Sequence, residues 1–134
     1  MRVLAECPLY PTESAEKVRK ALRNLFPDAV LGEEGARVRA EAGDLEHLRE
    51  LLQDQHIRDT ARDQFIAGWA GNFLRFSLSK QAAFAGRVSF AASSPLGDIT
   101  VTVEGEDLHV VIDHVAESTV GKRLSQDQPP HRRH

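Results

Sequence analysis

The sequence predicts a single α+β domain in which helices cover one face of a largely antiparallel sheet. Three observations support this fold class. The chain has 134 residues with 41% hydrophobic and 28% charged residues, which is typical of one globular domain. Several segments alternate apolar and polar residues, as half-buried strands do. Other segments repeat apolar residues at helical spacing.

The first half of the chain predicts a strand, a helix, a hairpin and two more helices. The strand ends at two prolines, and Thr12 is a plausible N-cap for the helix that follows. Two short alternating segments flank a glycine-containing loop and predict the hairpin. We expect these elements at residues 3–7, 13–26, 29–31, 36–40, 45–52 and 57–69.

The second half predicts three further strands, at 74–78, 87–90 and 99–103, and a closing helix at 108–115. From Ser118 onward the chain is polar and turn-rich. We therefore predict one domain over residues 1–117 and a disordered polar tail over residues 118–134. If the sheet face opposite the helices is open, the outward positions of its strands would bring together Arg37, Arg39, Arg75 and Arg87.

Charge is distributed unevenly along the chain. Residues 1–56 contain 8 Lys/Arg and 11 Asp/Glu, residues 57–90 contain 5 and 2, and residues 91–134 contain 4 and 7. A segment of net charge +3 thus lies between two segments of −3, consistent with the overall −3. This excludes a uniformly basic nucleic-acid binder but allows a local basic face. Ordinary fluctuation in surface charge is the simpler explanation.

Several functional classes find no support in the sequence. The apolar runs are too short to cross a bilayer, and the N-terminus lacks the apolar core of a signal peptide. A single cysteine allows no intrachain disulfide, and no histidine lies at a metal-binding spacing. No nucleotide or nucleophile motif occurs, so we expect no cofactor, no metal and no enzymatic activity. A small hydrolase using Asp113-His114 or His56 is a minor alternative.

The segment from Arg75 to Arg87 concentrates Arg, Lys and Gln among small residues, which suits contacts to phosphates and exposed bases. A solvated connection between strands explains the same pattern equally well. Four cations of the first predicted helix favour a solvated helix face over a ligand site: Lys17, Arg19, Lys20 and Arg23. Tyr10 and Phe84 lie outside the apolar stripes and are the better candidates for base stacking.

Several local phrases, in order, resemble uncharacterised protein family 0201, a family of small archaeal proteins described as RNA-binding and exosome-associated. These phrases are Tyr10-Pro11-Thr12-Glu13 followed by Lys17-Val18, Phe26-Pro27-Asp28-Ala29, Leu48-Arg49-Glu50-Leu51-Leu52, Gln55-His56-Ile57-Arg58-Asp59-Thr60-Ala61-Arg62, Lys80-Gln81-Ala82-Ala83 and Ser94-Pro95-Leu96-Gly97-Asp98-Ile99. The resemblance covers about residues 2–117. It implies a ribosomal protein L5-like fold, that of a large-subunit protein that contacts ribosomal RNA. The chain departs from the family pattern at Ser79, where Asn is usual.

The resemblance also implies which residues contact RNA. The family's characteristic polar phrases include Arg58, Arg62, Lys80 and Gln81, and they are flanked by Arg75 and Arg87. We expect the arginines and Lys80 to neutralise phosphates. We expect Gln81 to form hydrogen bonds with a base edge or a ribose.

The resulting hypothesis is a non-catalytic, cytoplasmic RNA-binding protein that acts with a ribosomal or exosome-type assembly. The alternative is a protein-interaction or assembly module that docks another chain through its sheet. Salt dependence distinguishes the two, because phosphate binding weakens steeply with salt and an apolar protein interface does not.

Overall fold

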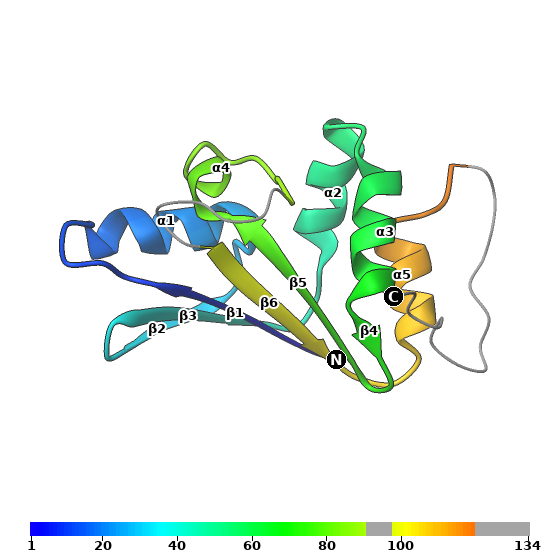
Figure 1. The fold of residues 1–134 in the computed structure, drawn as a ribbon, viewed down its shortest axis with the longest axis horizontal. Helices are drawn as coiled ribbons and strands as arrows, with labels where there is room; N and C mark the ends of the chain where they lie inside the picture. The colour runs from blue at the N-terminus through cyan, green and yellow to red at the C-terminus, as the bar shows by residue number, and fades with distance from the viewer. Residues whose placement is uncertain (91–97, 120–134) are drawn as a thin grey trace.

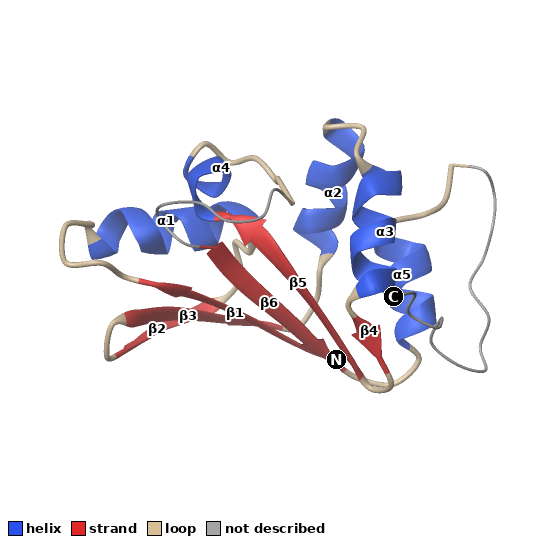
Figure 2. Ribbon diagram, viewed as in Figure 1, coloured by secondary structure: helices blue, strands red, loops and turns tan. Residues whose placement is uncertain are grey.

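The computed structural model describes residues 1–90 and 98–119. These residues form one six-stranded sheet with the strand order β2-β3-β1-β6-β5-β4, in which every neighbouring pair is antiparallel (Figures 1 and 2). The strands are β1 (Arg2–Pro8), β2 (Val30–Glu34), β3 (Arg37–Ala42), β4 (Trp69–Ala70), β5 (Phe73–Ser79) and β6 (Asp98–Glu104). The predicted fold class is confirmed.

In the described ranges, five helices lie on one side of the sheet, and the other side carries no helix. They are α1 (Ala15–Leu25), α2 (Glu46–Asp54), α3 (Arg58–Ala67), α4 (Lys80–Phe84) and α5 (Leu108–Val115). Figure 2 shows α1 and α4 over one end of the sheet, whereas α2, α3 and α5 gather at the other end. The helix layer therefore has two parts.

The core lies between the sheet and the helices, because the strands and helices turn their apolar residues toward each other. On β5, Leu74, Phe76 and Leu78 are buried, whereas Arg75 and Ser77 between them are exposed on the open side. The same alternation buries one face of β1, β3 and β6. Burial of these apolar side chains is the main favourable contribution to folding.

Several local structures differ from the sequence prediction. Residues 80–84 form α4 where a connection was expected, because the Ser79 side chain accepts a hydrogen bond from Ala82 N and caps a helix. Residues 88–90 form no strand, because the Gln55 amide takes both backbone hydrogen bonds of Val88. Similarly, α1 is capped by Ser14 rather than Thr12.

The third predicted helix ends earlier than its apolar stripe suggests. A Cβ atom at Gly68 would lie 1.8 Å from the backbone oxygen of Arg75, so only glycine allows β5 to approach so closely. This approach ends α3 at Ala67 and lets Trp69–Ala70 pair with β5. The predicted tail falls mostly on residues 120–134, which lie outside the described residues, so its boundary at residue 118 stays a prediction.

Candidate nucleic-acid interface

Lys80 is the first residue of α4, and the structure places it in the interior. Its side chain is 0% exposed. The ammonium donates hydrogen bonds to the backbone oxygen of Pro8 at 2.7 Å and to the Glu13 carboxylate at 2.9 and 3.2 Å. It also lies 5.0 Å from the centre of the Tyr10 ring. Lys80 therefore joins α4 to the segment that precedes α1, and its charge is neutralised within the fold.

Arg62, on α3, is likewise buried, with 7% of its surface exposed. One guanidinium nitrogen lies 2.7 Å from Asp113 Oδ1, and another donates a hydrogen bond to the backbone oxygen of Ala116 at 3.1 Å. These contacts fasten α5 to α3. Burial and pairing give Arg62 and Lys80 a structural role in the fold, and their expected phosphate role stays a prediction.

Arg75 lies on the open side of the sheet, away from the helices. Its Nε donates a hydrogen bond to Thr102 Oγ1 at 3.3 Å, and its guanidinium lies 5.6 Å from the centre of the Phe73 ring. The strand register places Arg37 and Arg39 on the same face, as expected. Arg87 does not share this face, since it follows α4 on the helix side of the molecule.

The open sheet face carries cations that are mostly paired with carboxylates. Glu6 lies 3.9 Å from Arg37 and 3.7 Å from Arg39 across the strand pair. Arg2, at the opposite end of β1, lies between two glutamates of neighbouring strands, at 3.4 Å from Glu41 and 3.2 Å from Glu104. The positive charge of this face is therefore largely compensated.

On the helix side, two contacts hold α4 against α1. The Asn24 side-chain amide donates hydrogen bonds to the backbone oxygens of Ala83 at 2.9 Å and Phe84 at 3.4 Å, near the C-terminal end of both helices. The Lys80 to Glu13 ion pair holds the N-terminal end. Together they fix the relative position of the two helices.

This arrangement brings α1 lysines beside the exposed end of α4. Lys17 lies seven residues before Asn24 and Lys20 lies four before it, so helical periodicity places both within about 40° of the Asn24 direction. Both lysines are exposed, as are Gln81 on α4 and Arg87 just after it. Sequence reasoning alone favours a solvated helix face for these lysines, because the position of α4 is set by contacts between distant residues.

A further clamp brings the turn between α2 and α3 next to Arg87. The Gln55 side chain donates to Val88 O at 2.9 Å and accepts from Val88 N at 2.8 Å. Arg58, the half-buried first residue of α3, follows this turn closely. We call the surface formed by Lys17, Lys20, Gln81, Arg87 and Arg58 the basic ridge.

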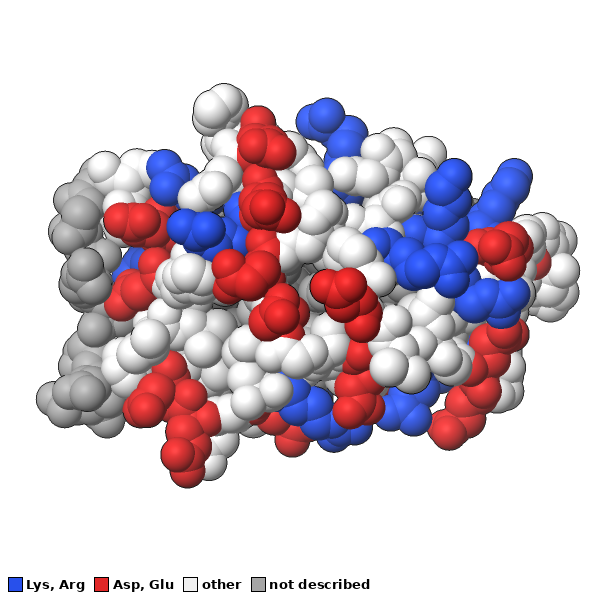
Figure 3. Space-filling view, turned by 180° about the vertical axis from the view of Figure 1, so that it is seen from behind, with Lys and Arg blue, Asp and Glu red and all other residues white. Residues whose placement is uncertain are grey.

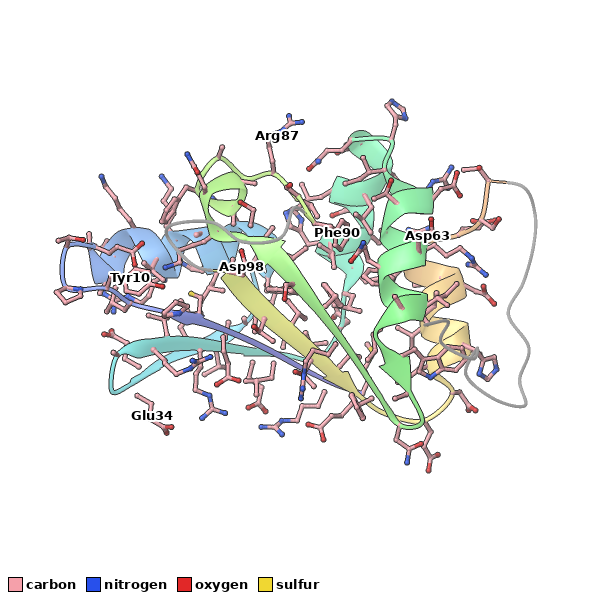
Figure 4. The ribbon with its side chains drawn as sticks, in the orientation of Figure 1. Tyr10, Glu34, Asp63, Arg87, Phe90 and Asp98 are labelled. Carbon is pink, nitrogen blue, oxygen red and sulfur yellow. The ribbon has the colours of Figure 1, made fainter. Side chains whose placement is uncertain are left out.

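The views of the whole molecule agree with this description. Seen from behind, Lys and Arg side chains gather over the α1 end of the molecule, beside a band of Asp and Glu side chains nearer its middle (Figure 3). Arg87 points away from the protein beyond α4, whereas Asp63 lies on α3 at the other end (Figure 4). Glu16 also contributes to the α1 surface, where it pairs with Arg19 at 3.2 Å and Arg23 at 3.6 Å. Lys17, Lys20 and Arg87 have no ion pair within the described residues.

The titratable groups weighed for catalysis have the following surroundings among the described residues. Burial raises the pKa of the Cys7 thiol to about 11, so the thiol stays protonated near neutral pH. Asp113 pairs with Arg62, and His114 Nε2 instead lies 2.7 Å from Glu46 Oε2. Within the described ranges there is no cluster of three or more residues that could hold a metal ion. No helix in these ranges has the length and apolar character needed to cross a bilayer.

Comparison with known proteins places the chain in a family. A family model described as RNA binding matches residues 2–105. The UPF0201 protein of Methanopyrus kandleri is 41% identical and covers 96% of this chain and 93% of its own length. That of Thermococcus kodakarensis is 38% identical, with 87% and 90% covered. The crystal structure of the UPF0201 protein from Methanococcus jannaschii matches with a TM-score of 0.81 and 33% identity over 87% of this chain and 99% of that one. The chain therefore belongs to the RNA-binding family that this model describes, together with the archaeal UPF0201 proteins, as its sequence phrases indicated.

Proposed function

We propose that this protein is a non-catalytic RNA-binding protein that contacts the RNA backbone through the basic ridge. Family membership supports RNA as the ligand class. The ridge is supported as the binding surface because its cations differ from the interior cations in exposure and in ion pairing. Lys17, Lys20 and Arg87 are exposed and form no ion pair within the described residues, whereas the interior cations are paired.

Exposed and paired cations lose different partners when a phosphate approaches. An unpaired surface lysine exchanges only water and mobile ions for the phosphate, and the ions released from the RNA favour binding. A cation in an ion pair must first give up its carboxylate partner. The exposed Gln81 amide adds a neutral donor and acceptor beside these charges.

The proposal extends to the setting in which the RNA is bound. The open sheet face, with its compensated charges, is available to a neighbouring subunit while the ridge holds RNA. This arrangement suits a ribosomal or exosome-type assembly in the cytoplasm. We also propose that the fold is related to that of ribosomal protein L5.

The test compares two double variants that remove equal charge from opposite sides of the molecule. Lys20→Gln with Arg87→Gln alters the ridge, and Arg2→Gln with Arg37→Gln alters the open sheet face. Binding of a fluorescent hairpin RNA is followed by anisotropy between about 50 and 200 mM KCl. Thermal melting confirms that both variants are folded.

We expect the ridge variant to bind more weakly and to lose about 0.7 to 0.9 from the slope of log K against log salt for each phosphate contact removed. The sheet variant should keep the slope of the parent protein. A ridge variant that binds as tightly as the parent at both low and moderate salt would contradict the proposal.

One feature favours the alternative of a protein-docking module. Strand β2 is an edge of the sheet, and its Val30 side chain is 76% exposed. A hollow of about 880 Å³ lies along this edge and is lined by residues that include Leu4, Leu31 and Arg39. An added strand from a partner would pair with the free backbone groups of β2. Binding of a partner here would show little salt dependence and would be unaffected by the ridge variant.

A further inference from the structure

The kind of RNA that the basic ridge suits follows from the side chains it lacks. Single-stranded RNA is recognised largely by stacking its bases on exposed aromatic rings. Among the described residues, the exposed aromatic side chains are Tyr10 at 39% and Phe73 at 40%. Neither belongs to the ridge, so the ridge offers charges and an amide but no ring.

The two exposed rings are also poorly placed to assist the ridge. Tyr10 lies near the N-terminal end of α1, away from Arg87 (Figure 4), and the buried Lys80 ammonium lies 5.0 Å from its ring centre. Phe73 belongs to β5 and lies on the open sheet face with Arg75. Phe84, the last residue of α4, and Phe90 are partly buried and pack against the core. A base that leaves its stack would find no ring on the ridge.

The ridge is, in contrast, rigidly built. The Asn24 contacts fix α4 against α1, and the Gln55 contacts fix the α2 to α3 turn against the segment after α4. The backbone segments that carry its charges are therefore held in set positions before RNA binds, which lowers the entropy cost of binding a partner with a regular structure. A double helix has such a structure, because its phosphates repeat at fixed spacing.

We propose that the basic ridge recognises double-helical RNA by its sugar-phosphate backbone in preference to single-stranded RNA. This inference rests on the proposed function and specifies its ligand. A-form RNA presents a wide, shallow minor groove with 2′-hydroxyl groups beside the phosphates. Lys17, Lys20 and Arg87 contact phosphates, and the Gln81 amide forms a hydrogen bond with a 2′-hydroxyl. Such contacts read the shape of RNA and not its sequence.

The experiment uses the full chain and three fluorescent probes of equal length. They are an RNA duplex of about 20 base pairs, one strand of that duplex alone, with a sequence chosen to form no structure, and a DNA duplex of the same sequence. Anisotropy titrations are made at two salt concentrations with the parent protein, with Lys20→Gln/Arg87→Gln and with Gln81→Ala. Expected for the parent is an affinity for the RNA duplex about tenfold higher than for the single strand.

The Gln81→Ala variant should reduce the preference for RNA duplex over DNA duplex by a few-fold and leave the salt slope unchanged, because an amide neutralises no phosphate. Equal or tighter binding of the single strand would overturn the inference. Suppose that the single strand binds as tightly as the duplex or more tightly. If Lys20→Gln/Arg87→Gln then lowered the affinity for duplex and single-stranded RNA equally, the proposed function would still hold. If this variant lowered neither affinity, the proposed function would fail as well.

Discussion

The two sides of the molecule carry similar cations but hold them differently. On the open sheet face, arginines from adjacent strands alternate with glutamates, and Glu6 alone lies within 4 Å of both Arg37 and Arg39. On the helix side, Lys20 and Arg87 extend into solvent with no ion pair within the described residues. The number of cations on a surface therefore does not identify a nucleic-acid interface; the availability of each charge does.

The difference arises from the geometry of the two kinds of structure. Antiparallel strands place residues on one face directly opposite each other, so an arginine and a glutamate in register meet across the strand pair. The register Glu6 to Arg39 and Arg2 to Glu104 shows this pairing. At Arg2, the hydrogen bond and charge of Glu41 raise the pKa of the guanidinium. On a helix the neighbouring side chains are those three and four positions away, and Glu16, four positions before Lys20, already pairs with Arg19 and Arg23.

The largest effect is expected where a cation has been taken into the interior. We predict that Lys80→Met lowers the free energy of unfolding by about 3 to 5 kcal/mol, because the Glu13 carboxylate, only 9% exposed, loses its partner. Urea denaturation followed by circular dichroism measures the loss. Adding Glu13→Gln should recover part of it, since the unpaired charge is removed.

The matched control is Lys20→Met, which makes the same replacement on the ridge. It should change the free energy of unfolding by less than about 0.5 kcal/mol while weakening RNA binding. The contrast between interior and surface cations would fail if Lys80→Met cost under about 1 kcal/mol. It would also fail if both lysines affected stability equally.

The same contrast shows which features the sequence could predict. Alternation of apolar residues predicted β1, β2, β3, β5 and β6, and helical stripes predicted α1, α2, α3 and α5, because burial of apolar surface is repeated regularly along the chain. Alternation also predicted a strand at 87–90 that does not form, and it missed the two-residue strand β4. The short helix α4 was missed because its five residues contain too little periodicity. Its cap at Ser79 is the only local signal, and this residue was noted as a departure from the family pattern.

The candidate site was less predictable than the fold, because availability of a charge depends on distant residues. Glu13 lies 67 positions from Lys80, and Asp113 lies 51 positions from Arg62, so no local pattern showed that these two cations would be paired. Gln81 and Arg87 were expected at an interface and lie on the exposed surface. For Lys17 and Lys20 the sequence favoured a solvated helix face, and the position of α4 is what brings them next to Gln81 and Arg87.

A change of intermediate size should come from releasing the paired arginines of the sheet. We predict that Glu6→Gln increases RNA affinity a few-fold at low salt and steepens the salt slope by about 0.7 to 0.9, because Arg37 and Arg39 lose a shared carboxylate. Glu106→Gln is the control, since it removes the same charge from an exposed turn before α5. Equal gains from both variants would show that net charge, and not pairing, keeps RNA away from the sheet.

The smallest effect concerns the end of the described chain, where Thr119 contacts α3. Its backbone N and hydroxyl donate hydrogen bonds to Asp59 at 3.3 and 2.6 Å, and these bonds lower the pKa of the Asp59 carboxyl. We predict that deleting residues 120–134 leaves the melting temperature within about 4 °C of the full chain. Deleting residues 118–134 should lower it by a further 1 to 2 °C or so at pH 7.

The further loss of melting temperature on deleting residues 118–134 should depend on pH, and this dependence identifies its cause. A carboxyl with a lowered pKa in the folded state adds stability above its unfolded pKa, near 3.9, and this stability disappears as the pH falls through the folded value. The difference between the two truncated proteins should therefore vanish at acidic pH and return in neutral buffer, as measured by thermal melting. Asp59→Asn in the full chain should lower the melting temperature by the same amount.

The deletion of residues 120–134 also tests the contrast between the two faces. If this deletion abolished RNA binding while the ridge variant did not, RNA would be recognised through the tail and not through the ridge. The tail sequence contains Lys122, Arg123, Arg132 and Arg133.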